Sequence, residues 1–353
     1  ADMLAPMLHV LPLATIIRER TLPVAGKVNA HVNQRVNPTD VIAEANYARE
    51  HVLFDVARTF GVPVSAADKM IRVNTGDRVM QGALVAESGG LMSRSIKAPR
   101  AGRVMIVGSG QVLMEVGDTR VELRAGLPGV VTQVLPERGV VIQTAGALIQ
   151  GVWGNGRIDN GLMVNLLQKP DEVLTADRLD VSLRGSVILG GHVRDVETLK
   201  AAAELPVRGL ILSSLLSPLI VLAYQMRYPI LVTDGFGSMP MNSAAYRLLT
   251  TNDKREVTVN AEHFDRYYGN RPEVIIPLPV STEPPEPNSF EPFRAGQTVR
   301  LRRPPHAGMI GTLSHLPAGL STLPSGLRAQ AAEVKLEDGE TVLVPLVNLE
   351  VVG

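Results

Sequence analysis

The sequence of 353 residues contains no cysteine, so disulfide bonds, thiolate zinc sites and cysteine nucleophiles are excluded. Aromatic residues make up only 4% of the chain, with one tryptophan, and the cores must therefore be built from aliphatic side chains and methionine. No apolar run reaches the roughly 18 residues that a membrane-spanning helix needs. The apolar N-terminus is interrupted by Pro6 and Pro12 and has no basic region, which argues against a signal peptide.

The chain also lacks an excess of charge of either sign. It has 35 basic and 35 acidic side chains, and its formal net charge is zero. Binding to polyanions relies on clustered positive charge, so this balance argues against nucleic acid as the main ligand but leaves a local basic patch open. Glycine and proline, in contrast, are abundant, with 32 and 25 residues. They favour many short strands joined by turns.

One pattern occurs more than once between residues 22 and 150: a short alternating strand, a glycine turn and another short strand. It is found at 22–28, 73–87 and 96–104, and in a weaker form at 126–131. The stretches GDRVMQGALVAE (76–87) and IKAPRAGRV (96–104) resemble the hairpin unit of biotinyl/lipoyl domains and related barrel-sandwich hybrids. The resemblance implies a barrel-sandwich hybrid over 22–150.

In the carrier members of that family, the modified lysine lies on an exposed hairpin seven residues before the alanine of the Ala-Pro return. Counted back from Ala98, that position is Leu91. The nearest lysine, Lys97, falls inside an expected strand. The resemblance therefore implies a hybrid without biotin or lipoate, and we expect no cofactor.

Apolar residues between 44 and 60 have helical spacing, with Val52, Val56 and Phe60 as its main positions. Gly61 and Pro63 follow as a stop signal. We predict a helical insertion at 44–60. Such insertions are typical of elaborated hybrids that dock within larger assemblies.

From 151 to 276 the pattern changes to strands that alternate with helices. Strands are expected at 186–191, 207–214 and 229–233, and the intervening helices begin after Asp195 and Ser217. This order predicts a parallel α/β sheet with right-handed crossovers. The segment 277–293 contains six prolines and is predicted to be an extended linker that few contacts cross.

The last segment, 294–353, resembles a KOW-type SH3-like barrel. The resemblance rests on AGQTVRLR (295–302), on PHAGMIGTL (305–313) with its G-x-x-G, and on the Asp338-Gly339 turn. The insertion at 319–330 is longer than the family's usual loop. Relatives of this type bind RNA or dock on ribosomes or polymerase. The whole chain is thus predicted to be a multi-domain β and α/β protein with an N-terminal segment at 1–21.

Open parallel sheets bind ligands at the carboxyl ends of their strands. The residues delivered to that edge include His192, Ser213, Ser214, Asp234 and Gly237. His192, Ser214 and Asp234 fit the roles of base, nucleophile and orienter. However, such residues after strands also serve as turn and cap residues, and no G-x-S-x-G, P-loop or G-x-G-x-x-G motif is present. We expect this edge to bind a ligand at most, with no catalytic residues.

Two further surfaces are candidates for partner binding. Leu91 and Met92 form an apolar hairpin tip. Arg300, Arg302 and Arg303 form a basic stripe, although acidic residues nearly neutralise this segment and a solvated strand face explains the stripe better than an RNA site does. The seven histidines are scattered without metal-ligand spacing, so no metal site is predicted.

The sequence favours a non-enzymatic interaction or assembly protein that binds a protein partner or its own copies. Two alternatives stay open. One is an α/β domain that binds or converts a small ligand, and the other is an RNA-, ribosome- or polymerase-associated factor acting through the KOW-like segment.

Overall fold

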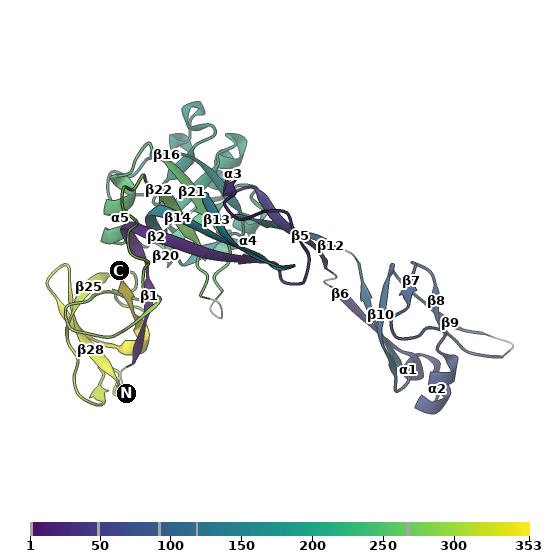
Figure 1. Ribbon diagram of the computed structural model, residues 1–353. Coiled ribbons are helices and arrows are strands. Elements are labelled where there is room, and N and C mark those ends of the chain that lie inside the picture. Colours follow the sequence, from purple (N-terminus) through teal and green to yellow (C-terminus); the bar gives the residue numbers. More distant parts are fainter. Residues whose placement is uncertain (1–2, 48–49, 91–92, 118, 266–268) are drawn as a thin grey trace.

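The computed structural model describes residues 3–47, 50–90, 93–117, 119–265 and 269–353, and the fold is mostly β (Figure 1). It has three parts: a central body built on a large mixed sheet, a lobe held away from the body, and a C-terminal module. Among the described residues, no helix is both long and apolar enough to span a bilayer.

The body contains a sheet of twelve strands within the described residues, ordered β15-β20-β19-β17-β16-β21-β22-β14-β13-β4, with β18 and β2 paired to β19 and β14. The strands are β2 (Val10–Thr21), β4 (Arg35–Val36), β13 (Gly129–Leu135), β14 (Gly139–Gln150), β15 (Trp153–Gly154), β16 (Ile158–Asn165), β17 (Val187–Leu189), β18 (His192–Val193), β19 (Gly209–Leu215), β20 (Ile230–Phe236), β21 (Glu256–Asn260) and β22 (Glu273–Pro277).

The predicted parallel α/β arrangement is present in this sheet. Strands β16, β17, β19 and β20 run parallel, and helices α3 (Val196–Glu204), α4 (Ile220–Gln225) and α5 (Ser243–Thr250) alternate with them. Buried aliphatic clusters lie on both faces, one against α5 and the other against α3 and α4. The parallel strands continue into antiparallel β21, β22 and β14, so the sheet crosses the domain boundary predicted at 150.

The lobe is joined to the body by a two-stranded ribbon (Figure 1). In this ribbon β5 (Val41–Tyr47) pairs with β12 (Thr119–Arg124), and β3 (Lys27–Val28) flanks β5. The lobe has a sheet ordered β6-β11-β10-β7 and a separate β8–β9 hairpin. Its elements are β6 (Glu50–Asp55), α1 (Val56–Phe60), α2 (Val64–Met70), β7 (Arg78–Val79), β8 (Leu84–Glu87), β9 (Ser95–Lys97), β10 (Gly102–Gly108) and β11 (Gln111–Val116).

The predicted helix at 44–60 is wrong over most of its length. Only Val56–Phe60 is helical, and strands β5 and β6 take up most of the rest. The residues Val52, Phe54 and Val56 are also spaced by two, which is the period of a strand, and Val52 and Phe54 pack on the lobe core. Antiparallel pairing of β6 with β11 decides between the two periods.

The C-terminal module has a sheet ordered β23-β1-β30-β24-β25-β28-β29. Its elements are β1 (Leu4–Leu8), β23 (Phe290–Pro292), β24 (Thr298–Leu301), β25 (Ile310–His315), β26 (Ser321–Thr322), β27 (Arg328–Ala329), β28 (Ala331–Leu336), β29 (Thr341–Pro345) and β30 (Leu349–Val352). The predicted N-terminal segment is not separate, because β1 pairs parallel with β30 and antiparallel with β23, while β2 joins the body.

The proline-rich segment 277–293 is also more than a spacer. Its first residue ends β22, and β23 lies near its other end. Between them, the carbonyl oxygens of Pro284 and Pro285 accept hydrogen bonds from the hydroxyl and N–H of Thr15, at 2.6 and 3.2 Å. The segment therefore packs on β2. The prediction that few contacts cross it is also wrong, because the ion pairs Asp234–Arg300 and Arg271–Glu350 join residues on its two sides.

Candidate functional site

The carboxyl ends of β18, β19 and β20 bring part of the predicted ligand site together. His192 pairs with Ser214 across neighbouring strands, and the His192 Nδ1 lies 2.9 Å from the Ser214 Oγ. The His192 Nε2 lies 3.3 Å from the Ser238 Oγ. Burial lowers the pKa of His192 below its ordinary value, which favours the neutral imidazole.

The direction of the hydrogen bonds is unsuited to a nucleophile and its base. The single hydroxyl proton of Ser214 is donated to the Met239 carbonyl at 2.8 Å, and the Ser214 Oγ accepts the Met239 N–H at 3.0 Å. The Met239 carbonyl can only accept, so with the Ser214 hydroxyl directed at it the His192 Nδ1 is the donor to the Ser214 Oγ. The pair therefore holds the 238–239 loop on the strands.

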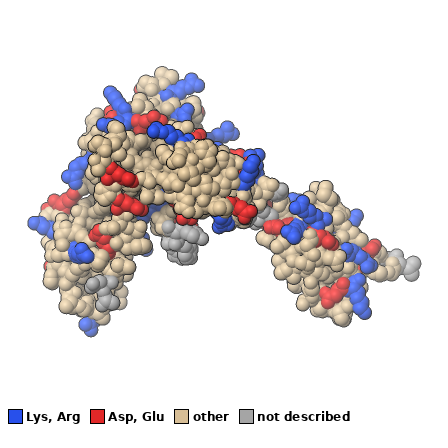
Figure 2. All heavy atoms as spheres, viewed as in Figure 1, with Lys and Arg blue, Asp and Glu red and all other residues tan. Residues whose placement is uncertain are grey.

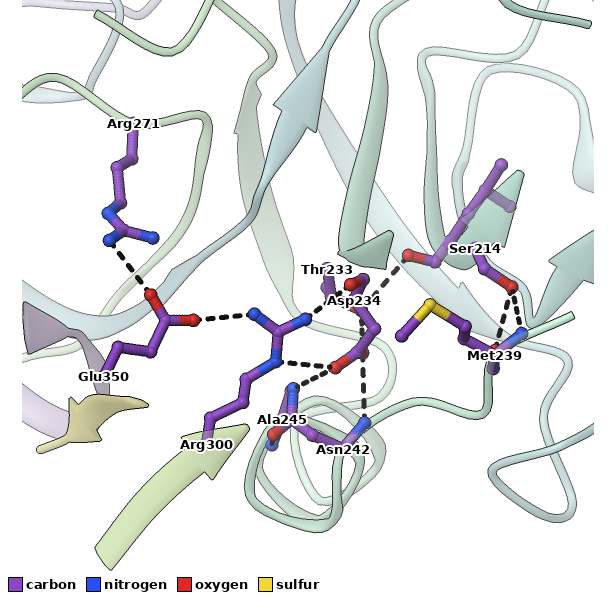
Figure 3. Close-up of polar contacts among 10 residues, drawn as sticks. Ser214, Thr233, Asp234, Met239, Asn242, Ala245, Arg271, Arg300 and Glu350 are labelled. Atoms are coloured by element: carbon purple, nitrogen blue, oxygen red, sulfur yellow. Dashed lines mark hydrogen bonds and ion pairs between the residues drawn. The ribbon is translucent and has the colours of Figure 1, made fainter. Parts of the chain in front are cut away.

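Asp234 belongs to a separate hydrogen-bond network (Figure 3). Its Oδ2 accepts hydrogen bonds from the Thr233 hydroxyl at 2.7 Å and from the Asn242 N–H at 3.0 Å. The Asn242 side-chain amide donates to the Asp234 Oδ1 at 3.0 Å. No hydrogen bond joins Asp234 to His192 among the described residues, so the three predicted triad residues are not assembled.

Of the two other predicted ligand residues, Gly237 has a structural role, and Ser213 makes no side-chain hydrogen bond within the described residues. The N–H of Gly237 donates to the Leu215 carbonyl at 3.0 Å, and the φ of Gly237 is +98°, a conformation that favours glycine. Ser213 is fully buried, and its hydroxyl has no hydrogen-bond partner within the described part of the chain.

Arg300 of the C-terminal module links Asp234 to two more charged residues (Figure 3). Its Nε lies 3.4 Å from the Asp234 Oδ1, and its Nη2 donates to the Asp234 carbonyl oxygen. The Arg300 Nη1 donates to the Glu350 Oε1 at 2.6 Å, and the Arg271 Nη2 donates to the Glu350 Oε2 at 3.2 Å. This buried network, Asp234–Arg300–Glu350–Arg271, joins the body to the module.

The pKa values of the two carboxyl groups of the network shift in opposite directions. Burial alone would raise the pKa of Glu350, but Arg300 and Arg271 outweigh it and hold that pKa below its ordinary value. For Asp234, complete burial dominates and raises the pKa, against the opposing effects of Arg300 and the donors on Thr233 and Asn242. Glu350 is therefore the carboxylate that the network holds ionised.

The predicted basic stripe is only partly exposed. Arg300 is 3% exposed, so it is not part of an accessible surface, whereas Arg302 and Arg303 are exposed. The strand ends at Leu301, which removes the expected alternation between Arg300 and Arg302. The other predicted partner residues, Leu91 and Met92, lie outside the described residues.

A row of buried polar side chains, not expected from the sequence, crosses the body sheet. Asn260 on β21 pairs with Glu273 on β22, which pairs with Gln150 on β14. His9 follows next to Gln150, since the His9 N–H donates to the Gln150 Oε1 at 3.0 Å. All four are between 3% and 8% exposed. No local motif marks these residues, because they come from four distant segments.

This row borders a cleft of about 210 Å³. Two arginines of β2 close it: Arg18 forms an ion pair with Glu273 at 2.7 Å, and Arg20 forms one with Glu262. Leu148 on β14 and Ile275 on β22 are each two residues from the polar row, lie on the same face of the sheet and are buried. The polar row is therefore a local departure from an apolar face, suited to hydrogen bonding with a small polar molecule.

Within the described residues, no group of three histidine or acidic side chains is placed to hold a metal ion.

A scan against protein-family models finds no match for this chain, and a search of curated proteins finds no relative.

Proposed function

We propose that this chain is a non-enzymatic interaction or assembly protein. In this proposal the body and the C-terminal module form one unit through the Asp234–Arg300–Glu350–Arg271 network, and the lobe is the arm that docks on a protein partner or on another copy. The observation that carries the proposal is an exposed apolar row on the outer face of the lobe.

The outer row consists of Ile106, Leu113 and Leu53 on three adjacent strands, β10, β11 and β6. Ile106 is 60% exposed and Leu53 is 58% exposed. Polar rows flank them: Arg103, Glu115 and His51 on one side, and Gly108, Gln111 and Asp55 on the other. An exposed apolar strip with a polar rim is typical of a protein-docking surface.

The finer assignment of the modules belongs to the same proposal. We assign the lobe, which contains both quoted carrier-like stretches, to the barrel-sandwich hybrids without the modified lysine. We assign the C-terminal module to the KOW-type SH3-like barrels, with the N-terminal strand β1 added. Both kinds of module dock on larger partners, and neither assignment requires biotin, lipoate or another cofactor.

The hydrogen bonds at the carboxyl ends of β18, β19 and β20 also favour assembly over catalysis. The Ser214 hydroxyl donates its hydrogen bond to the Met239 carbonyl, and Asp234 pairs with Arg300 instead of hydrogen-bonding to His192. The RNA alternative receives less support, because Arg300 is buried and basic and acidic side chains are interspersed on the face drawn in Figure 2.

The test is the mass of the native particle. In extract of the source organism, we expect the chain to sediment as a particle heavier than its own 37.9 kDa. The double variant Leu53→Glu, Ile106→Glu should sediment close to the monomer, because charge on the apolar row opposes desolvation. Val181→Glu is the matched control: Val181 is 76% exposed on the body, and its variant should behave as the wild type.

A further variant separates assembly from catalysis. His192→Ala should assemble as the wild type does and support the same growth of the source organism. A wild-type chain that sediments as a monomer in extract, or a His192→Ala chain that assembles but abolishes function, would contradict the proposal.

The buried polar row favours a second candidate function, the binding of a small polar molecule in the 210 Å³ cleft. Native mass spectrometry of protein from its source should then show a bound small molecule that Gln150→Leu loses, because leucine has no amide to bond it. Gln168→Leu, at an exposed position, should keep it. Wild-type protein of unmodified mass would argue against this candidate.

A further inference from the structure

Strand β29 is an edge strand of the C-terminal module, since it pairs only with β28 in its sheet. The hydrogen bonds from the Leu336 N–H to the Glu340 carbonyl and from the Leu346 N–H to the Gln330 carbonyl fix its register. Hydrogen-bonded pairs alternate along an antiparallel ladder. Val342 and Val344 therefore bond to β28, and the N–H and C=O groups of Thr341 and Leu343 point to the free edge.

The free edge borders the largest of the clefts described for this molecule, with a volume of about 550 Å³. All five residues of β29 line this cleft. Two loops, 303–306 and 323–325, also line this cleft. Thr341 is exposed and Leu343 is half-buried, so the unpaired backbone groups lie along an accessible strand. A strand of five residues offers about 17 Å of edge.

We propose that this cleft binds an extended peptide segment of a partner protein, which adds to β29 as a further strand. Main-chain hydrogen bonds to Thr341 and Leu343 supply the affinity. The accessible apolar residues of the walls, among them Leu323 and Pro324, contact alternate side chains of the peptide.

The cleft is lined by one arginine, Arg303, and one glutamate, Glu340, so an acidic residue of the peptide is favoured at the position beside Arg303. Arg303 lines the cleft and is exposed, and no ion pair involves it among the described residues. His306 lines the same wall. The loops that flank the cleft favour one thin segment over a second copy of this chain, because the β29 edge of a second copy carries the same flanking loops.

The site is separate from the outer row of the lobe, and its test leaves that row intact. The probe is a fluorescein-labelled peptide, acetyl-Glu-Val-Thr-Val-Thr-Val-amide, titrated into the full chain and followed by anisotropy. Two N-methylated forms are compared with it: one carries methyl groups on the amide nitrogens of the odd-numbered peptide residues, and the other on those of the even-numbered residues. We expect the parent to bind saturably, one methylated form to match it, and the other to lose about tenfold or more through two missing hydrogen bonds.

Variants of the protein locate the binding. Leu343→Pro removes no N–H that bonds to β28, because the Leu343 N–H points to the free edge, so it should fold with a cooperative unfolding transition and weaken the peptide at least fivefold. Arg303→Glu should weaken the acidic peptide, and Arg184→Glu, at an exposed position on the body, should leave its affinity unchanged.

Three results would overturn the proposal. The first is no binding of the parent peptide at about 1 mM, where the binding free energy is only about 4 kcal/mol. The second is equal affinity of both methylated forms, which would show that no one-sided strand pairing occurs. The third is a purified chain that dimerises and becomes monomeric in Leu343→Pro, which would assign the edge to a second copy.

Discussion

Replacing Arg300 by methionine should lower the free energy of unfolding by about 3–5 kcal/mol. Arg300 is buried between two carboxylates, and methionine fills similar space without donors. The variant leaves the buried Asp234 without its cation and leaves Glu350 with Arg271 as its remaining ion-pair partner. Removing one partner of a buried charge network costs more than the network contributes as a whole, because the remaining charges have lost their contact with water.

Arg302→Met is the matched control, because Arg302 is two positions away and exposed. It should change the free energy of unfolding by less than about 0.5 kcal/mol. Urea unfolding of both variants, followed by circular dichroism, measures the difference. Equal stability of Arg300→Met and Arg302→Met would mean that the network does not join the body to the module.

The loss in Arg300→Met should also depend on pH. Glu350 has a pKa below its ordinary value of 4.5 in the folded protein, so its stabilising contribution is present above that value and is lost as the pH falls through the folded pKa. Protonated Glu350 carries no charge, so less stabilising interaction is lost when Arg300 is removed. The difference between wild type and Arg300→Met should therefore be largest near neutral pH and should shrink below about pH 4.5.

A single charge on the inner face of β1 should unfold the C-terminal module. Ala5 is 0% exposed in a strand that lies between β23 and β30. Ala5→Asp buries a carboxylate without a partner, and we expect it to cost about 4 kcal/mol or more. The neighbouring residue Leu4 points outward and is 60% exposed, so Leu4→Asp should cost less than about 1 kcal/mol.

Limited proteolysis checks this second prediction. Ala5→Asp should expose sites throughout 294–353, while Leu4→Asp should digest like the wild type. A fragment that begins at Phe293 lacks both β1 and β23 and should stay unfolded until a peptide of residues 1–9 is added. A fragment that folds alone would restore the independent C-terminal module expected from the sequence.

Several features of this fold depend on neighbouring residues in the chain, and these could be predicted from the sequence. Asp195 precedes α3 and accepts the Thr198 N–H at 2.8 Å, as expected of a helix cap. The alternation of aliphatic strands with helices likewise predicted the parallel part of the body sheet, but the expected cap at Ser217 is wrong, because Ser217 is the first residue of a 3-10 helix without a side-chain cap. The absence of cysteine excludes thiol chemistry by composition alone.

Other features depend on pairing between distant segments, and only the tertiary structure decided them. The apolar residues at 52, 56 and 60 fit a helix, whereas those at 52, 54 and 56 fit a strand, and pairing with β11 selected the strand. Asp234 lies near the carboxyl end of β20, where catalytic residues of parallel sheets are found, yet its partner Arg300 is 66 positions away. The polar row at 9, 150, 260 and 273 has no local signature at all. Local propensity determines caps, turns and strand periods, whereas burial and ion pairing arise only when remote side chains meet.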